Sequence, residues 1–254
     1  MLIKNFKKDN LEVSVFDTRR EMGLKAAQDV RSEILRLFKT KDEINMLFAA
    51  APSQNDFLQT LISYKDIDWT RINAYHMDEY LGIDKDAPQA FGNFLKNALF
   101  SKLNFKTVNY IDGTAEDVTK ECMRYEELLN NNTIDIVCMG IGENGHIAFN
   151  DPPVADFSDK VKVKIVKLDE LCRQQQVNDK CFENIHQVPK YAITLTIPAL
   201  FEGKKLFCIV PAPTKANAVY DTLNGKIEEK CPASILRLHL AANLYLDKDS
   251  ASRL

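Results

Sequence analysis

The chain has 254 residues, of which 45% are hydrophobic and 27% are charged, as is usual for water-soluble globular proteins. Its 33 basic and 36 acidic residues form no long run of one sign, so we expect neither nucleic acid nor a membrane surface as a partner. The N-terminus has no apolar leader, and apolar runs such as residues 46–52 are too short to cross a bilayer.

The six cysteines predict a reducing compartment. None of them forms a CxxC pair, and Cys138 and Cys208 lie within apolar runs, where a free thiol behaves as a small hydrophobic group. We therefore expect a cytoplasmic protein.

Helices are predicted from apolar residues that recur every three or four positions. The clearest stripe runs from Met22 to Leu37 among charged neighbours. Side chains that can cap a helix N-terminus precede the predicted helices. These candidate caps, in chain order, are Thr18, Ser53, Thr114 and Thr214.

Strands are predicted from short runs that are apolar throughout, which is typical of a parallel sheet with helices on both faces. The runs are Ile44 to Ala49, Arg71 to Tyr75, Thr107 to Ile111, Ile134 to Met139, Val161 to Val166, Tyr191 to Leu195 and Leu206 to Val210. Only Val161 to Val166 alternates with lysines, which favours an edge strand or one solvent-exposed face. Residues 151–159, with two prolines, predict an irregular loop.

The alternation of strands and helices predicts one α/β domain over residues 1–254, a Rossmann-like, mainly parallel open sheet flanked by helices on both faces. In such sheets, ligands bind beyond the carboxyl ends of the strands. Four segments that follow predicted strands are therefore candidate parts of a site, namely residues 49–55, 76–80, 140–152 and 211–215.

Two of these segments carry groups suited to acid-base chemistry. Residues 76–80 are expected to form a loop with adjacent acids, Asp78 and Glu79, although a helix-capping acid is the simpler interpretation of such a pair. Residues 140–152 bring three glycines close to His146, whose side chain gains and loses a proton near neutral pH.

The other two segments suggest an anion site. Lys215 follows a predicted strand and stands in the first turn of a helix, where a cation is unfavourable unless an anion also binds there. Ser53 and its following N–H groups offer a second contact of the same kind. A solvent-exposed lysine and a helix-capping serine are the alternatives.

Neither a cofactor nor a metal is expected. The glycines at 140, 142 and 145 match GxGxxG, but they lie past mid-chain and are not expected to open the first helix of a dinucleotide site. The four histidines have no paired metal-ligand spacing. We therefore expect an acid-base mechanism that uses neither a cofactor nor a metal.

These residues resemble those of the glucosamine-6-phosphate deaminases, also called isomerases. The resemblance covers most of the chain and is strongest in four stretches, Met77 to Gly82, Gly140 to Pro152, Gln187 to Thr194 and Pro232 to Leu238. Asp-Glu-Tyr at 78–80 together with Gly-His-Ile-Ala-Phe-Asn at 145–150 favours this branch. The related 6-phosphogluconolactonases typically have Asp-Glu-Arg and Gly-His-Thr-Ala-Ser instead.

The resemblance implies a cofactor-independent enzyme that opens the ring of a 2-amino-2-deoxy sugar phosphate, moves a proton from C2 to C1 and releases ammonia. It implies that Asp78 takes the C2 proton and that His146 opens the ring. Asp151, in place of the usual Glu, and Asn144 would orient His146. The implied substrate and phosphate ligands are Ser53, Gln54, Glu79, Gly142, Gly145, Lys180 and Lys215.

The phosphate loop departs from the family pattern. Members usually carry Thr-Gly-Gly-Thr after the first core strand, where this chain has Ala49-Ala50-Ala51-Pro52. Lys180 falls near the usual phosphate arginine, whose two-pronged geometry a lysine does not reproduce. The alternatives are therefore a galactosamine 6-phosphate enzyme, a 6-phosphogluconolactonase and a sugar-phosphate sensor without catalysis. A homo-oligomer is left open.

Overall fold

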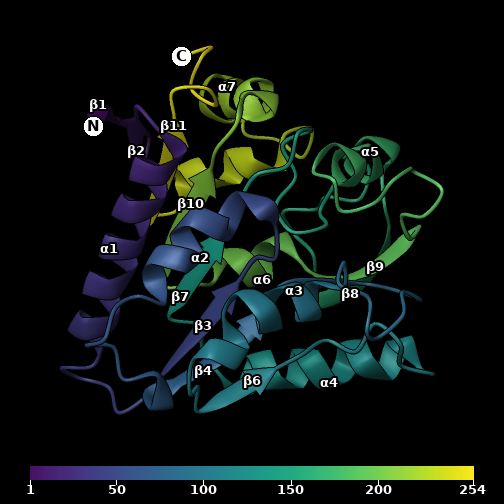
Figure 1. The fold of residues 1–254 in the computed structure, drawn as a ribbon. Helices are drawn as coiled ribbons and strands as arrows, with labels where there is room; N and C mark the ends of the chain where they lie inside the picture. Colours follow the sequence, from purple (N-terminus) through teal and green to yellow (C-terminus); the bar gives the residue numbers. More distant parts are fainter.

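The computed structural model describes all 254 residues and has an eight-stranded sheet at its centre. The strand order is β1-β2-β11-β10-β7-β3-β4-β6, and every neighbouring pair is parallel except the β1–β2 hairpin. Figure 1 places β1, β2 and β11 at one end of this sheet and β6 at the other. No helix of the chain has the length and apolar character that a membrane crossing requires.

The helices are α1 (Arg19–Leu37), α2 (Asn55–Leu61), α3 (Phe91–Ala98), α4 (Val118–Asn131), α5 (Glu170–Asn178), α6 (Ile197–Phe201) and α7 (Ala216–Asn224). The strands of the large sheet are β1 (Leu2–Lys8), β2 (Leu11–Phe16), β3 (Ile44–Phe48), β4 (Ile72–His76), β6 (Thr107–Asn109), β7 (Ile136–Met139), β10 (Lys205–Val210) and β11 (Ala242–Asp247). A small antiparallel sheet contains β5 (Asp78–Tyr80), β9 (Tyr191–Leu195) and β8 (Val163–Lys167), in that order.

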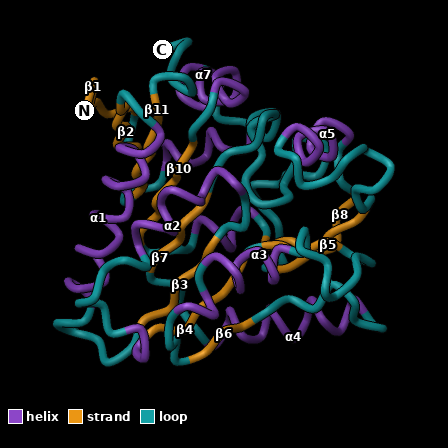
Figure 2. Tube along the Cα trace, in the orientation of Figure 1, coloured by secondary structure: helices purple, strands orange, loops and turns teal.

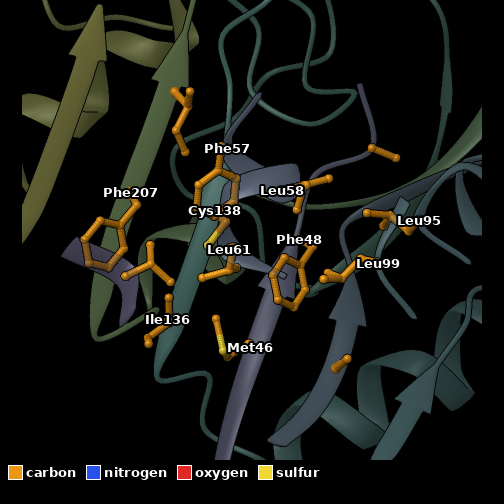
Figure 3. Packing of buried hydrophobic residues seen from close by; sticks show 14 of the residues in the cluster. Met46, Phe48, Phe57, Leu58, Leu61, Leu95, Leu99, Ile136, Cys138 and Phe207 are labelled. Carbon is orange, nitrogen blue, oxygen red and sulfur yellow. The ribbon is translucent and has the colours of Figure 1, made fainter. Parts of the chain in front are cut away.

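Successive residues of a strand point to opposite sides of the sheet, and helices bury both faces of the large sheet. Met46 and Phe48 of β3 pack with α1, α2 and α3 in one hydrophobic cluster, part of which is drawn in Figure 3. Leu47, between them, belongs to a second cluster with α4, α6 and α7. This arrangement confirms the predicted α/β class and the helices on both faces.

The seven predicted strands are all present, within three residues at each end. The prediction missed four strands, β1, β2, β5 and β11. Val163–Lys167 is an edge strand, as expected, but it lies in the small sheet, as does Tyr191–Leu195. Figure 2 shows the irregular backbone of the loops that connect the two sheets. Residues 151–159 form turns without a regular element, as predicted.

Three of the four predicted helix caps are wrong. Thr18 does cap α1, because its side chain accepts a hydrogen bond from the Glu21 N–H. The cap of α4 is Asp117, three residues after Thr114, because its carboxylate accepts from the Lys120 N–H. Ser53 and Thr214 lie inside short 3-10 turns that lead into α2 and α7, and neither caps a helix.

Candidate active site

Four neighbouring parallel strands, β10, β7, β3 and β4, deliver the four predicted segments to one cavity at their carboxyl ends. Including its open mouth, the cavity encloses about 500 Å³. It is lined by Ala49, Ala50, Ala51, Ser53, Gln54, Met77, Asp78, Phe91, Gly140, Ile141, Gly142, His146, Ala148, Phe149, Gln175, Gln176 and Lys215.

Asp78 is a buried carboxyl group without a partner in the protein. The chain passes from β4 to β5 through the single residue Met77, so the expected loop is instead a strand that places Asp78 at the cavity wall. The side chain is 5% exposed and makes no hydrogen bond or ion pair with another residue. Burial and the nearby charge of Glu79 raise its pKa well above the usual value, so this carboxylate is an unusually strong base when ionised.

His76 fixes the backbone at Asp78. Its Nε2 accepts a hydrogen bond from the Ile111 N–H at 2.8 Å, so the ring proton is on Nδ1, which donates to the Asp78 carbonyl at 3.0 Å. The ring is fully buried, and this burial lowers its pKa to about 4. His76 is therefore a neutral structural residue.

His146 is held by two acceptors. Its Nδ1 lies 2.9 Å from Asp151 Oδ1 and 2.8 Å from Asn144 Oδ1, which assigns the Nδ1 proton to these contacts and leaves Nε2 without a protein partner. Asn144 also donates to Asp151 at 3.1 Å. Burial alone would raise the pKa of Asp151, but the charge of His146 and the hydrogen bonds to the carboxylate lower it, so the carboxylate stays ionised beside the ring.

Two glycines make room for this histidine. A Cβ on Gly142 would lie 2.1 Å from His146 Cε1, so only glycine allows the ring to occupy its place. Gly145 has a φ of +84°, and a Cβ there would approach Cys231 Sγ to 2.9 Å. Gly142 thus shapes the wall of the site, Gly145 allows the turn before His146, and no helix starts at this segment.

Lys215 is a buried ammonium group without an acidic partner. It is 4% exposed, lines the cavity and forms no ion pair within 4.0 Å. Burial lowers its pKa, although the charges of Asp179 and Glu143 oppose this effect. A buried cation without a partner is costly, and an anion in the cavity would offset this cost.

Ser53 and Gln54 approach the same cavity from the turn after β3. The Gln54 amide donates to Ser53 Oγ and to the Ile209 carbonyl, both at 3.2 Å. Its Oε1 is buried and has no partner. The pair is thus anchored to β10, next to the turn that carries Lys215.

Three predicted ligands, Glu79, Gly145 and Lys180, do not line this cavity. Glu79 points to the start of α3, where its carboxylate accepts hydrogen bonds from the N–H groups of Phe91 and Gly92 at 2.9 and 2.7 Å. These contacts agree with the interpretation of this acid as a helix cap. Lys180 is exposed and lines two neighbouring hollows instead.

Sequence analysis missed the contribution of α5. Gln175 and Gln176 are both buried, line the cavity and follow Cys172 on this helix. No motif marked them, because a run of glutamines on a short helix has the composition of an ordinary surface. Cys172 completes the one group of potential metal ligands, together with His146 and Asp151.

Comparison with known proteins places the chain in a family. A family model described as glucosamine-6-phosphate isomerases/6-phosphogluconolactonase matches residues 17–244. The glucosamine-6-phosphate deaminase of Clostridium acetobutylicum is 33% identical over 238 residues, which are 92% of this chain and 96% of that protein. The homologous deaminase of Clostridium novyi is 32% identical over 96% of this chain and its own full length.

Solved structures agree on the fold. A monomeric glucosamine-6-phosphate deaminase superposes with a TM-score of 0.86 at 29% identity, over 94% of this chain and 98% of that one. The 6-phosphogluconolactonase of Thermotoga maritima has a TM-score of 0.77 at 19% identity, over 94% and 100% of the two chains, which is a similarity of fold alone. The chain belongs to the family of glucosamine-6-phosphate isomerases and 6-phosphogluconolactonases.

Proposed function

We propose that the protein is a glucosamine-6-phosphate deaminase, which converts this amino-sugar phosphate and water into fructose 6-phosphate and ammonia. One observation carries the proposal. An unpaired buried carboxyl group at Asp78, an oriented imidazole at His146 and an unpaired buried ammonium at Lys215 line the same cavity. These are a base, an acid-base group and an anion ligand, which this reaction needs.

Ring opening is assigned to His146. Its neutral ring accepts the proton of the anomeric hydroxyl at Nε2, and the resulting cation returns a proton to the ring oxygen as the C1–O bond breaks. Asp151 and Asn144 stabilise the Nδ1–H tautomer, which leaves Nε2 as the accepting atom. The negative charge of Asp151 stabilises that cation, whereas the neutral Asn144 stabilises it only through the dipole of its amide.

The proton transfer is assigned to Asp78. Its carboxylate removes the proton from C2 of the open sugar, and a proton of the substrate ammonium group passes to the C1 oxygen, which gives an enolamine. The carboxylate then delivers its proton to C1, which converts the enolamine into a C2 iminium ion. Water then adds to C2, and ammonia leaves as the ketone forms. These steps move only protons and water, so the proposal requires neither a metal nor an organic cofactor.

The phosphate group is assigned to Lys215. Ser53 and Gln54 lie on the same wall, and Gln176 lines the cavity as well as the adjoining hollow beside Ala50 and Ala51. The Gln176 amide makes no hydrogen bond with another side chain, so it is available to the phosphate. Gln176 thus provides hydrogen-bond donors from α5, whereas Lys180 does not line the cavity.

The lactonase alternative is disfavoured by the surroundings of Tyr80. Its ring is buried against Phe91, Phe149 and Phe182, with ring centroids 4.7 to 5.7 Å apart. No cation from this position reaches the cavity. In this chain Tyr80 therefore packs in the hydrophobic core, whereas lactonases typically have an arginine at this position.

A galactosamine 6-phosphate substrate remains the second candidate, because the loop of residues 49–55 lacks the usual glycines. The test is ammonia release from purified protein with each hexosamine 6-phosphate, compared by kcat/KM. We expect glucosamine 6-phosphate to give the higher ratio. A higher ratio for the galactose epimer would reassign the substrate, and thermal stabilisation by both sugars without ammonia release would make the protein a sensor.

A cytoplasmic location is part of the proposal. All six cysteines are free thiols and five of them are buried, which suits the reducing cytoplasm that we propose.

A further inference from the structure

Cys172 has no part in the proposed reaction, yet it lies beside the groups that orient His146. Its Sγ, a ring nitrogen of His146 and a carboxylate oxygen of Asp151 all lie within 4.8 Å of one another. The residues Cys172, His146 and Asp151 are 1%, 8% and 1% exposed. They come from α5 and from the segment after β7, so the tertiary fold and not a sequence motif brings them together.

The three donor atoms match the preference of one class of metal. Thiolate sulfur, imidazole nitrogen and carboxylate oxygen are the ligands of Zn²⁺, with bonds of about 2.0 to 2.3 Å. In a tetrahedral site with such bonds, the ligand atoms lie roughly 3.3 to 3.8 Å apart. Nδ1 of His146 and Oδ1 of Asp151, now 2.9 Å apart, must therefore separate slightly, and the wider pairs, which are up to 4.8 Å apart, must contract. A water molecule from the cavity can complete the shell.

We propose that His146, Asp151 and Cys172 form an inhibitory site for Zn²⁺ and other thiophilic divalent cations. The metal bonds to Nδ1 of His146, to a carboxylate oxygen of Asp151 and to the Cys172 sulfur. The thiol proton is released to solvent, and the Nδ1 proton moves to Nε2. One proton is thus released for each metal ion bound at neutral pH.

Inhibition follows from the position of the metal. In the proposed reaction, Nδ1 keeps its proton and Nε2 accepts one from the substrate. Metal on Nδ1 leaves the remaining ring proton on Nε2, so this atom cannot accept another. Because Asp151 then binds the metal, it no longer accepts a hydrogen bond from the imidazole. This inhibition rests on the proposed function, but the binding itself does not.

The test is therefore spectroscopic as well as kinetic. The purified apoprotein is titrated with Cd²⁺, and the ultraviolet thiolate-to-metal charge-transfer band is recorded. We expect one Cd²⁺ per chain in the wild type, with the band abolished in Cys172→Ser and Cys172→Ala. Cys181→Ser, which changes a half-buried cysteine outside the cluster, is the matched control and should keep the band.

Zn²⁺ inhibition of ammonia release is then measured against the metal-free rate of each protein. The Cys172 variants should need about 100-fold more Zn²⁺ for half inhibition, in line with the loss of a metal ligand or its support. A chelator should restore the wild-type rate. The proposal is overturned if no charge-transfer band forms in the wild type, or if it persists in both Cys172 variants. Equal sensitivity of all the proteins to Zn²⁺ would also overturn it. Loss of the deaminase proposal alone would leave the Cd²⁺ result unaffected.

Discussion

The imidazole of His146 rests directly on Gly142, so that a Cβ at position 142 would lie 2.1 to 2.3 Å from three atoms of the ring. The replacement Gly142→Ala must therefore displace His146 from Asp151. We expect kcat to fall by about 100-fold or more, the usual loss when an acid-base group is misplaced, with the far-ultraviolet circular dichroism unchanged.

Gly82→Ala is the control for this substitution. Gly82, unlike Gly142, has a positive φ, +76°, but a Cβ there has no atom within 4 Å, and the residue does not line the cavity. Backbone strain alone should lower the melting temperature while kcat stays near the wild-type value. If Gly142→Ala retains full kcat, the position of His146 does not matter for the reaction.

Asp78→Asn removes the proposed carbon base. We expect kcat to fall about 100- to 10,000-fold, because an amide cannot accept the C2 proton. The fold should persist, since Asp78 makes no side-chain hydrogen bond that the change would break. Single-turnover ammonia release, with thermal unfolding alongside, is the measurement.

The adjacent acid provides the matched comparison. Glu79→Gln weakens the cap of α3, where the carboxylate accepts from Phe91 and Gly92. This change should cost about 0.5–2 kcal/mol of stability and leave most of the turnover intact. An equal loss of kcat in both variants would contradict the separate roles that the geometry gives to these carboxyl groups.

The decrease of kcat/KM at low pH should reflect protonation of Asp78. Burial, followed by the charge of Glu79, raises the pKa of this carboxyl, and only the ionised form can act as base. Activity should therefore be present above that pKa and lost as the pH falls through it. Glu79→Gln removes the charge contribution, so the midpoint in kcat/KM should move to lower pH. An unchanged midpoint would assign this decrease to another group.

Lys215→Met should weaken substrate binding. Charge-assisted hydrogen bonds contribute about 1.5–3 kcal/mol, so KM should rise roughly 10- to 150-fold with a smaller change in kcat. The thermal stability of the free protein should not fall, because a buried ammonium without a partner is removed. Lys180→Met makes the same change at an exposed position and should leave KM within about twofold. A larger effect at Lys180 would move the phosphate site.

His76 should make stability depend on pH. Its pKa is lowered by burial from about 6.5 to about 4, so the unfolded chain binds the extra proton between these values. The contribution of neutral His76 is complete above pH 6.5 and is lost progressively as the pH falls to about 4. Urea unfolding across this range should show a shallower pH dependence in His76→Gln than in the wild type. Parallel curves would mean that His76 is not buried in its neutral form.

The α/β class and the strands were predictable because their signal is local. Residues such as Leu47 and Val137 are flanked by other apolar residues, and a strand with both faces buried has few alternatives. The strands β1 and β2 were missed since their charged and polar residues resemble a surface segment. β5 was missed because three residues that begin with two acids form a strand only through pairing with β9.

The candidate site was predictable in part for a related reason. In a parallel sheet, the segment after each strand reaches the same edge, so Asp78, His146 and Lys215 could be expected to meet. The role of Glu79 could not be decided in this way. Its neighbour Asp78 faces the cavity and Glu79 faces α3, because successive strand residues point to opposite sides.

The sequence by itself determined seven of the eleven strands, the edge of the sheet that holds the site and the acid-base groups gathered there, since each depends on periodicity or on position after a strand. Only the tertiary structure decided that Lys180 stays outside the cavity, that Gln176 lines it and that Cys172 lies beside His146 and Asp151. These outcomes depend on how α5 packs over the end of the sheet, which is set by contacts between residues far apart in the chain.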